Sequence, residues 1–125
     1  MAQTLTLTFM SGSRDGAVLQ LETAGSPPSV SIGREAPCEL VIADDPDLSR
    51  RHARIFWSGS TWMIEDLGSS NGTFVGEFQA ARRLSTSAEL KSGEIFRVGL
   101  TRLRLGGSKD DRVSAAAAAA NATRI

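Results

Sequence analysis

Cysteine and histidine each occur only once in this chain of 125 residues, as Cys38 and His52. A single cysteine excludes a disulfide within the chain, and one residue of each type excludes the usual zinc sites, which draw four ligands from several Cys and His side chains. We therefore expect no metal and no cofactor that depends on such ligands. The composition fits a reducing compartment, and we expect a cytoplasmic protein.

Long apolar runs and an excess of one charge are also missing. No segment approaches the roughly 18 apolar residues that a membrane-spanning helix needs, and the first ten residues (MAQTLTLTFM) lack the charged start and continuous apolar stretch of a signal peptide. Lys plus Arg and Asp plus Glu both number 14. Because there is no overall basic excess, we expect neither a nucleic acid nor a membrane surface as partner.

Alternation of apolar and polar residues is the main structural signal. Leu5, Leu7 and Phe9 share one face of an expected strand, with threonines on the other, as in a half-buried β-strand. Similar short segments separated by turns predict strands at residues 3–10, 17–23, 29–33, 39–42, 53–57, 61–66, 72–75, 89–90, 94–98 and 101–105. Many short strands at this spacing are typical of a β-sandwich or barrel.

The C-terminal part of the chain has a different composition. After residue 106 the apolar alternation stops, and residues 115–120 are six consecutive alanines. A helix of six residues would be marginal by itself, so this segment is typical of a linker or tail. The sequence predicts one domain over residues 1–106 and a low-complexity Ala-rich tail over residues 107–125.

Two polar segments interrupt the strand pattern. Ser49-Arg50-Arg51-His52 directly precedes the strand expected at 53–57, and residues 68–73 (GSSNGT) follow the strand expected at 61–66. If these neighbouring strands pair antiparallel, both loops lie at the same end of the sheet. Loops held in this way by a rigid scaffold are where binding residues concentrate.

Three short motifs occur in a fixed order: Gly33-Arg34, then Ser49-x-x-His52, then Asn71-Gly72. In this order and at strand ends, they resemble the pattern of the forkhead-associated (FHA) domain, a β-sandwich module that binds phosphothreonine peptides. The resemblance covers roughly residues 3 to 106. It implies an all-β, FHA-like sandwich of about eleven mainly antiparallel strands, with the binding loops at one end.

The resemblance also assigns roles to individual residues. It implies phosphate contacts from Arg34, Ser49, Arg50 and Ser70, and pairing of the Asn71 amide with the peptide backbone. It implies that His52 braces the loops. Gly33 and Gly72 are expected to have structural roles, Gly72 where the backbone needs a positive φ or a close approach. A phosphate with about −1.5 to −2 charge and three acceptor oxygens needs such convergent donors and a fixed cation.

The function that the resemblance implies is phosphothreonine-dependent binding, without catalysis or cofactor, in signalling by Ser/Thr protein kinases. The expected partner is a protein or peptide that contains phosphothreonine, either the kinase or its substrate. A phosphate-independent structural interaction module of the same fold is the alternative. Residues 68–72 also match G-x-S-x-G, the nucleophile elbow of α/β hydrolases, but no histidine follows Ser70, so the order Ser, acid, His is absent.

Overall fold

Two β-sheets packed face to face form the structure, a computed structural model that describes residues 4–23 and 25–106. Within these residues there are eleven strands and two short 3-10 helices. The six-stranded sheet contains β1 (Thr4–Phe9), β2 (Val18–Glu22), β7 (Thr73–Val75), β8 (Arg82–Arg83), β10 (Ile95–Val98) and β11 (Thr101–Leu105). The five-stranded sheet contains β3 (Ser29–Gly33), β4 (Leu40–Val41), β5 (Ala53–Trp57), β6 (Trp62–Asp66) and β9 (Ser87–Leu90). The helices are η1 (Gly12–Arg14) and η2 (Phe78–Ala80).

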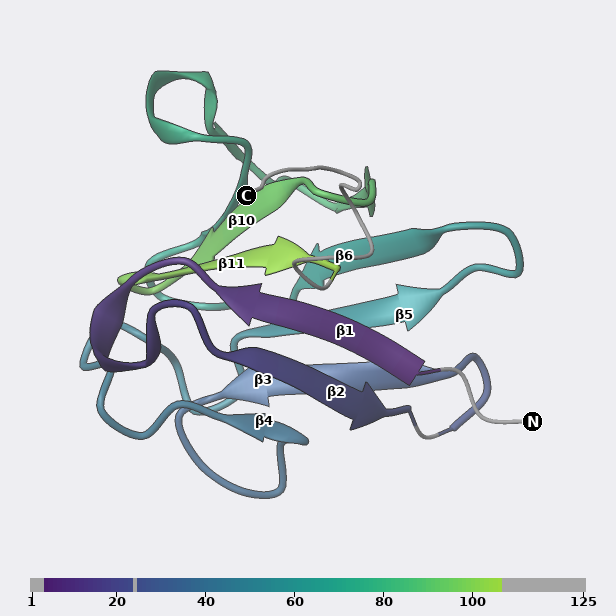
Figure 1. Ribbon diagram of the computed structural model, residues 1–125, viewed down its shortest axis with the longest axis horizontal. Coiled ribbons are helices and arrows are strands. Elements are labelled where there is room, and N and C mark those ends of the chain that lie inside the picture. The colour runs from purple at the N-terminus through teal and green to yellow at the C-terminus, as the bar shows by residue number, and fades with distance from the viewer. Residues whose placement is uncertain (1–3, 24, 107–125) are drawn as a thin grey trace.

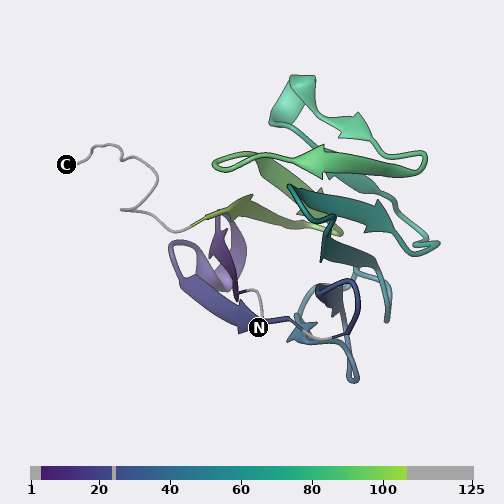
Figure 2. The same ribbon diagram turned by 90° about the vertical axis from the view of Figure 1, so that its right-hand side faces the viewer.

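The two layers are visible in Figure 1, where β1, β2, β10 and β11 lie in front of β3, β4, β5 and β6, and Figure 2 shows the same arrangement from the side. The strand order is β2-β1-β11-β10-β7-β8 in one sheet and β4-β3-β5-β6-β9 in the other. All of the strand pairs are antiparallel except β3 with β4. The expectation of an all-β sandwich of about eleven mainly antiparallel strands is confirmed.

The core lies between the sheets and is built from the alternating residues of each strand. Leu5, Leu7 and Phe9 of β1 face inward with exposures of 2% or less, as the sequence predicts. Leu103 and Leu105 of β11 are also buried, while the arginines between and before them are only half-buried. This period of two is what a sheet with one face on the core and one face toward solvent requires.

One strand was not predicted from the sequence. Residues 76–87 have no alternation, yet they contain η2 and the two-residue strand β8, which pairs with β7 through Phe74 and Arg83. Leu84 of this segment is partly buried and packs against the core. β8 forms by pairing with the edge of β7, and the local sequence pattern does not reveal such a tertiary interaction.

Strand pairing brings five connections to one end of the sandwich. Ala53 at the start of β5 pairs with Asp66 at the end of β6, and Thr73 at the start of β7 pairs with Val98 at the end of β10. The loops at 34–39, 42–52 and 67–72 therefore meet the β1–β2 and β10–β11 turns at this end, on the left in Figure 1. We call it the loop end.

The described residues contain no helix that is long and apolar enough to cross a membrane. The Ala-rich tail predicted over residues 107–125 lies outside the described residues, so the predicted domain boundary stays a prediction.

Candidate functional site

His52 lies at the centre of the loop end, fully buried, and connects two loops that are 20 residues apart in sequence. Its Nδ1 accepts a hydrogen bond from the backbone N–H of Ser49 at 3.0 Å, and its Nε2 lies 2.8 Å from the carbonyl oxygen of Gly72. Since a carbonyl only accepts, Nε2 carries the proton and donates it to Gly72. The imidazole ring is therefore neutral and fixed in one tautomer.

Both nitrogens of the His52 ring are thus occupied by backbone groups. The general base of a hydrolase must instead reach the hydroxyl of its nucleophile within hydrogen-bond distance. Ser70 of the G-x-S-x-G match interacts through its backbone N–H with Ser49, not with the His52 ring. The nucleophile elbow weighed from the sequence has no counterpart in this arrangement.

Ser49 and Ser70 come from the two different loops and are joined directly. The backbone N–H of Ser70 donates to Ser49 Oγ at 3.1 Å. Ser49 Oγ acts here as an acceptor, so its own O–H proton remains available for another acceptor. Ser70 is exposed and Ser49 is half-buried. The predicted proximity of the two loops is confirmed, and it leaves a hydroxyl donor at their junction.

Asn71 makes a second connection between the same two loops. Its side-chain N–H group donates to the backbone carbonyl of Asp47 at 2.8 Å, and Asn71 itself is exposed. An amide has two N–H donors and one carbonyl acceptor, so this bond occupies one of its donors. The remaining donor and the acceptor can still pair with an extended backbone laid across the loops.

Arg34 joins this group through its backbone. Its N–H donates to the carbonyl oxygen of Ser49 at 3.1 Å, which fixes the start of the β3–β4 loop beside the Ser49 loop. The side chain is half-buried, and its guanidinium makes no hydrogen bond or ion pair with any other described residue. Arg50, next to Ser49, is exposed. Two arginines without a carboxylate partner among the described residues therefore lie next to Ser49, Arg34 through its backbone hydrogen bond and Arg50 in sequence.

The two motif glycines are required by close packing and backbone conformation. Gly33 is buried, and a Cβ there would collide with the carbonyl oxygen of Arg50 and lie 2.7 Å from the sulfur of Cys38. Gly72 has φ +88°, and a Cβ there would lie 2.6 Å from Nε of Arg83. Glycine adopts such a φ without strain, so this backbone conformation favours glycine at position 72.

Asp66, at the end of β6, organises the GSSNGT loop and was missed by the sequence analysis. Its carboxylate accepts hydrogen bonds from the hydroxyls of Ser69 (2.5 Å) and Thr73 (2.7 Å) and from the backbone N–H groups of Gly68 and Ser69. Burial by itself raises the pKa of Asp66, but these four hydrogen bonds outweigh it and hold the pKa below its ordinary value.

Asp45 has the same role for the other loop and was missed as well. It is 4% exposed, and its carboxylate accepts from the backbone N–H of Asp47, the backbone N–H of Leu100 and the hydroxyl of Thr101. These bonds tie the segment before Ser49 to the β10–β11 turn. A carboxylate just after a strand is the available sequence signal, since Asp often caps turns, but two of its three partners, Leu100 and Thr101, are 55 and 56 residues away.

The site as a whole is a set of hydroxyl, amide and guanidinium donors on loops. Hydrogen bonds to Asp45, His52 and Asp66 hold these loops in place. Such a set suits an anion with several acceptor oxygens. No group of three His, Cys, Asp or Glu side chains that could hold a metal ion occurs in the described part of the chain.

This chain is similar in sequence to a known domain family and to curated proteins that contain that domain. The family model of the FHA domain matches residues 30–99. The FHA domain-containing protein FhaB of Mycobacterium tuberculosis is 36% identical over 91 residues, which cover 73% of this chain and 56% of FhaB. The FhaB of Mycolicibacterium smegmatis is 40% identical over 83 residues, 66% of this chain and 50% of that protein. The chain thus spans about half the length of these relatives.

Solved structures give the same result. An FHA domain studied for its phosphothreonine-dependent interactions superposes with a TM-score of 0.64 at 29% identity, over 85% of this chain and 98% of that chain. EmbR of Mycobacterium tuberculosis, solved in complex with a low-affinity phosphopeptide, superposes with a TM-score of 0.68 at 27% identity, over 84% of this chain and 24% of EmbR.

Proposed function

This chain belongs to the FHA domain family, whose members are non-catalytic binding modules, and we propose that it binds phosphothreonine-containing proteins or peptides. The observation that carries the proposal is the linked set at the loop end. Two hydrogen bonds of 3.1 Å join Arg34, Ser49 and Ser70: the Arg34 N–H donates to the Ser49 carbonyl oxygen, and the Ser70 N–H donates to Ser49 Oγ. Donors on the three side chains remain available.

The phosphate group is held by cations and hydroxyl donors. Arg34 supplies a planar guanidinium that can bind two phosphate oxygens at once, and no carboxylate competes for it among the described residues. The Ser49 hydroxyl donates to a third oxygen, because the Ser70 N–H occupies one of its two lone pairs and leaves its proton available. Ser70 and Arg50, both exposed, complete the set from either side.

The peptide backbone is held by Asn71. Its free N–H and its carbonyl pair with one backbone carbonyl and one backbone N–H of an extended ligand. Gly33, His52 and Gly72 do not touch the ligand in this proposal. They keep the two loops at the correct separation, through the buried ring of His52 and the two close backbone approaches.

The proposed partner is a Ser/Thr protein kinase or its substrate in the cytoplasm, switched on by phosphorylation, with no nucleic acid, membrane or cofactor involved. Each charge-assisted hydrogen bond contributes roughly 1.5 to 3 kcal/mol. Three or four of them, reduced by the cost of ordering a flexible peptide, correspond to a dissociation constant of order micromolar. Such binding is reversible and depends on the phosphate.

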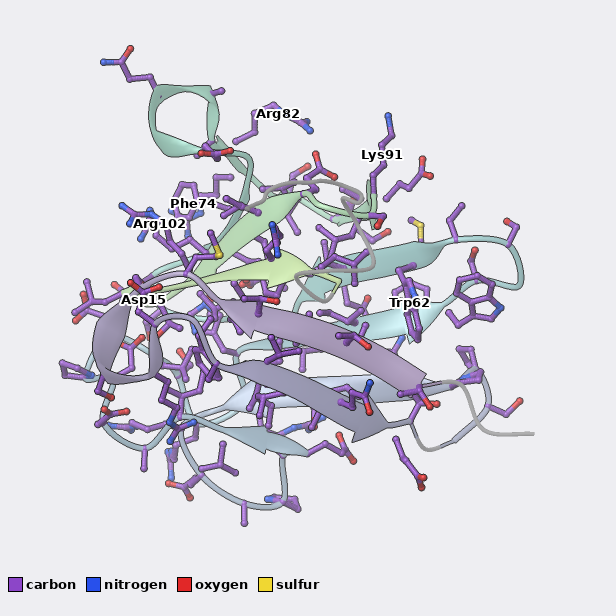
Figure 3. The ribbon with its side chains drawn as sticks, in the orientation of Figure 1. Asp15, Trp62, Phe74, Arg82, Lys91 and Arg102 are labelled. Carbon is purple, nitrogen blue, oxygen red and sulfur yellow. The ribbon has the colours of Figure 1, made fainter. Side chains whose placement is uncertain are left out.

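The test is fluorescence anisotropy with one peptide sequence in phosphothreonine and threonine forms, against three proteins: the native chain, Arg34→Ala and Lys91→Ala. Lys91 is an exposed cation in the β9–β10 turn at the opposite end of the sandwich (Figure 3), so its loss removes the same charge. We expect Arg34→Ala to weaken phosphopeptide binding about tenfold to 150-fold, the value of one such bond, and Lys91→Ala to change it less than twofold. Equal loss in both variants would contradict the assignment of Arg34.

A further inference from the structure

Arginines form a row across the outer face of the six-stranded sheet. The strand register places Arg102 of β11 opposite Arg97 of β10, Arg97 opposite Phe74 of β7, and Phe74 opposite Arg83 of β8. Residues opposite each other in neighbouring strands point to the same face. Arg104 lies two residues beyond Arg102 and on the same face. We call Arg83, Arg97, Arg102 and Arg104, with Phe74 between them, the arginine face.

This clustering of arginines has an electrostatic cost. Like charges directly opposite in adjacent strands are destabilising, and Arg97 and Arg102 form such a pair. Arg83, Arg97 and Arg104 make no ion pair with any described residue, and the Nε of Arg104 is buried without a hydrogen-bond partner. The whole chain has a formal net charge of zero. The arginine face is therefore a local concentration of positive charge that the composition of the chain does not reveal.

The guanidinium of Arg97 is held in a fixed position. Its Nη1 donates to the carbonyl of Gly99 at 2.8 Å, and the group lies 4.3 Å from the centre of the Phe74 ring. Stacking on an aromatic face and one hydrogen bond restrain the side chain while its other N–H groups stay available. A restrained guanidinium loses less conformational entropy when it binds a carboxylate.

The arginine face is continuous with the phosphopeptide site. The exposed Arg83 lies against the backbone of Gly72, since a Cβ on Gly72 would come within 2.6 Å of Arg83 Nε and 2.9 Å of its guanidinium carbon. Gly72 directly follows Asn71, the proposed contact of the peptide backbone. In Figure 3, Phe74 and Arg102 lie on the same side of the sheet, toward the end that carries Asp15, whereas Lys91 and Trp62 lie toward the other end.

We propose that the arginine face binds acidic side chains that flank the phosphothreonine of the partner. The inference rests on the proposed function. An extended peptide advances about 3.3 Å per residue. Because Arg83 lies against Gly72, next to Asn71, an acid within a few residues of the phosphothreonine comes within reach of Arg83. Arginine and carboxylate can pair through two parallel hydrogen bonds, so the face selects partners with Asp or Glu in this flank.

A protein segment fits this face better than a nucleic acid. Nucleic-acid binding at physiological salt draws on many phosphate contacts spread along the duplex, whereas the arginine face is confined to a few neighbouring strands of one sheet. It also begins beside the loop where an extended peptide is already held, which makes the second contact intramolecular once the phosphate is bound.

The experiment compares four peptides by fluorescence anisotropy at 50 mM and 300 mM salt. Three contain phosphothreonine, with neutral flanks, with three glutamates on the N-terminal side, or with three glutamates on the C-terminal side. The fourth is the better acidic peptide with unmodified threonine. The proteins are the native chain, Arg83→Gln, and Arg54→Gln, which removes a cation from the other sheet. Urea unfolding checks that both variants are folded.

We expect one acidic flank to strengthen phosphopeptide binding roughly three- to tenfold at 50 mM salt, as one or two exposed ion pairs do, with a smaller gain at 300 mM. Arg83→Gln should reduce the gain below twofold without changing affinity for the neutral phosphopeptide, and Arg54→Gln should preserve it. Equal affinity of neutral and acidic phosphopeptides, with phosphate dependence intact, overturns the inference and leaves the proposed function standing. Equal affinity of the phosphorylated and unmodified acidic peptides overturns both. A labelled DNA duplex is measured beside the peptides, and Arg83-dependent binding of the duplex without any acidic-flank gain would overturn the inference and assign the face to nucleic acid.

Discussion

Replacing His52 by alanine is expected to be the most damaging single change at the loop end. The ring is fully buried, and its two hydrogen bonds, 3.0 Å to the N–H of Ser49 and 2.8 Å to the carbonyl of Gly72, are lost together. A buried backbone group without a partner costs about 1–3 kcal/mol, and the missing ring leaves a cavity that adds to this. We expect the free energy of unfolding to fall by about 3–5 kcal/mol.

Urea unfolding followed by the fluorescence of the two tryptophans measures this loss, by linear extrapolation at constant m-value. Arg51→Ala is the matched control, because Arg51 precedes His52 and is exposed; a surface change of this kind should stay within about 0.5 kcal/mol. If His52→Ala costs less than about 1 kcal/mol, the ring does not hold the two loops together, and the reasoning from its hydrogen bonds is refuted.

Two further predictions concern the frame of the site. Gly33→Ala should destabilise the fold by about 1–3 kcal/mol, the cost of overpacking, because the new Cβ collides with the Arg50 carbonyl; an unchanged urea midpoint would show that the backbone can relax. The pKa of Asp66 lies below its ordinary value of 3.8, so its contribution to stability is complete above pH 3.8 and is lost as pH falls through the folded-state pKa. The stability difference between the native chain and Asp66→Asn should therefore shrink in acid, and a difference constant from pH 7 to pH 2 would contradict this sign.

The strands were predictable because their cause is local. A strand with one face on the core must alternate, and residues 29–33, 53–57 and 101–105 were expected within the observed bounds. The meeting of the Ser49 and Ser70 loops followed from antiparallel pairing alone. The strand predictions use only residues within a few positions of one another, and the loop prediction adds only the pairing of two successive strands.

What was missed depends on partners distant in sequence. Asp45 is defined by the β10–β11 turn, and Asp66 by hydroxyls that only converge once the loop is closed. The strand β8 depends on the edge of β7. The arginine face likewise requires the register of four strands, because Arg83, Arg97 and Arg102 are unremarkable charges when each is considered alone.

Binding of the purified chain to a degenerate peptide library with a fixed phosphothreonine, beside the same library with unmodified threonine, tests the central claim most directly. The account predicts selective capture of the phosphorylated pool by the native chain and loss of that selectivity in Arg34→Ala. Equal capture of both pools, or partner pull-downs that phosphatase treatment leaves unchanged, would contradict it and would favour a phosphate-independent interaction module of the same fold.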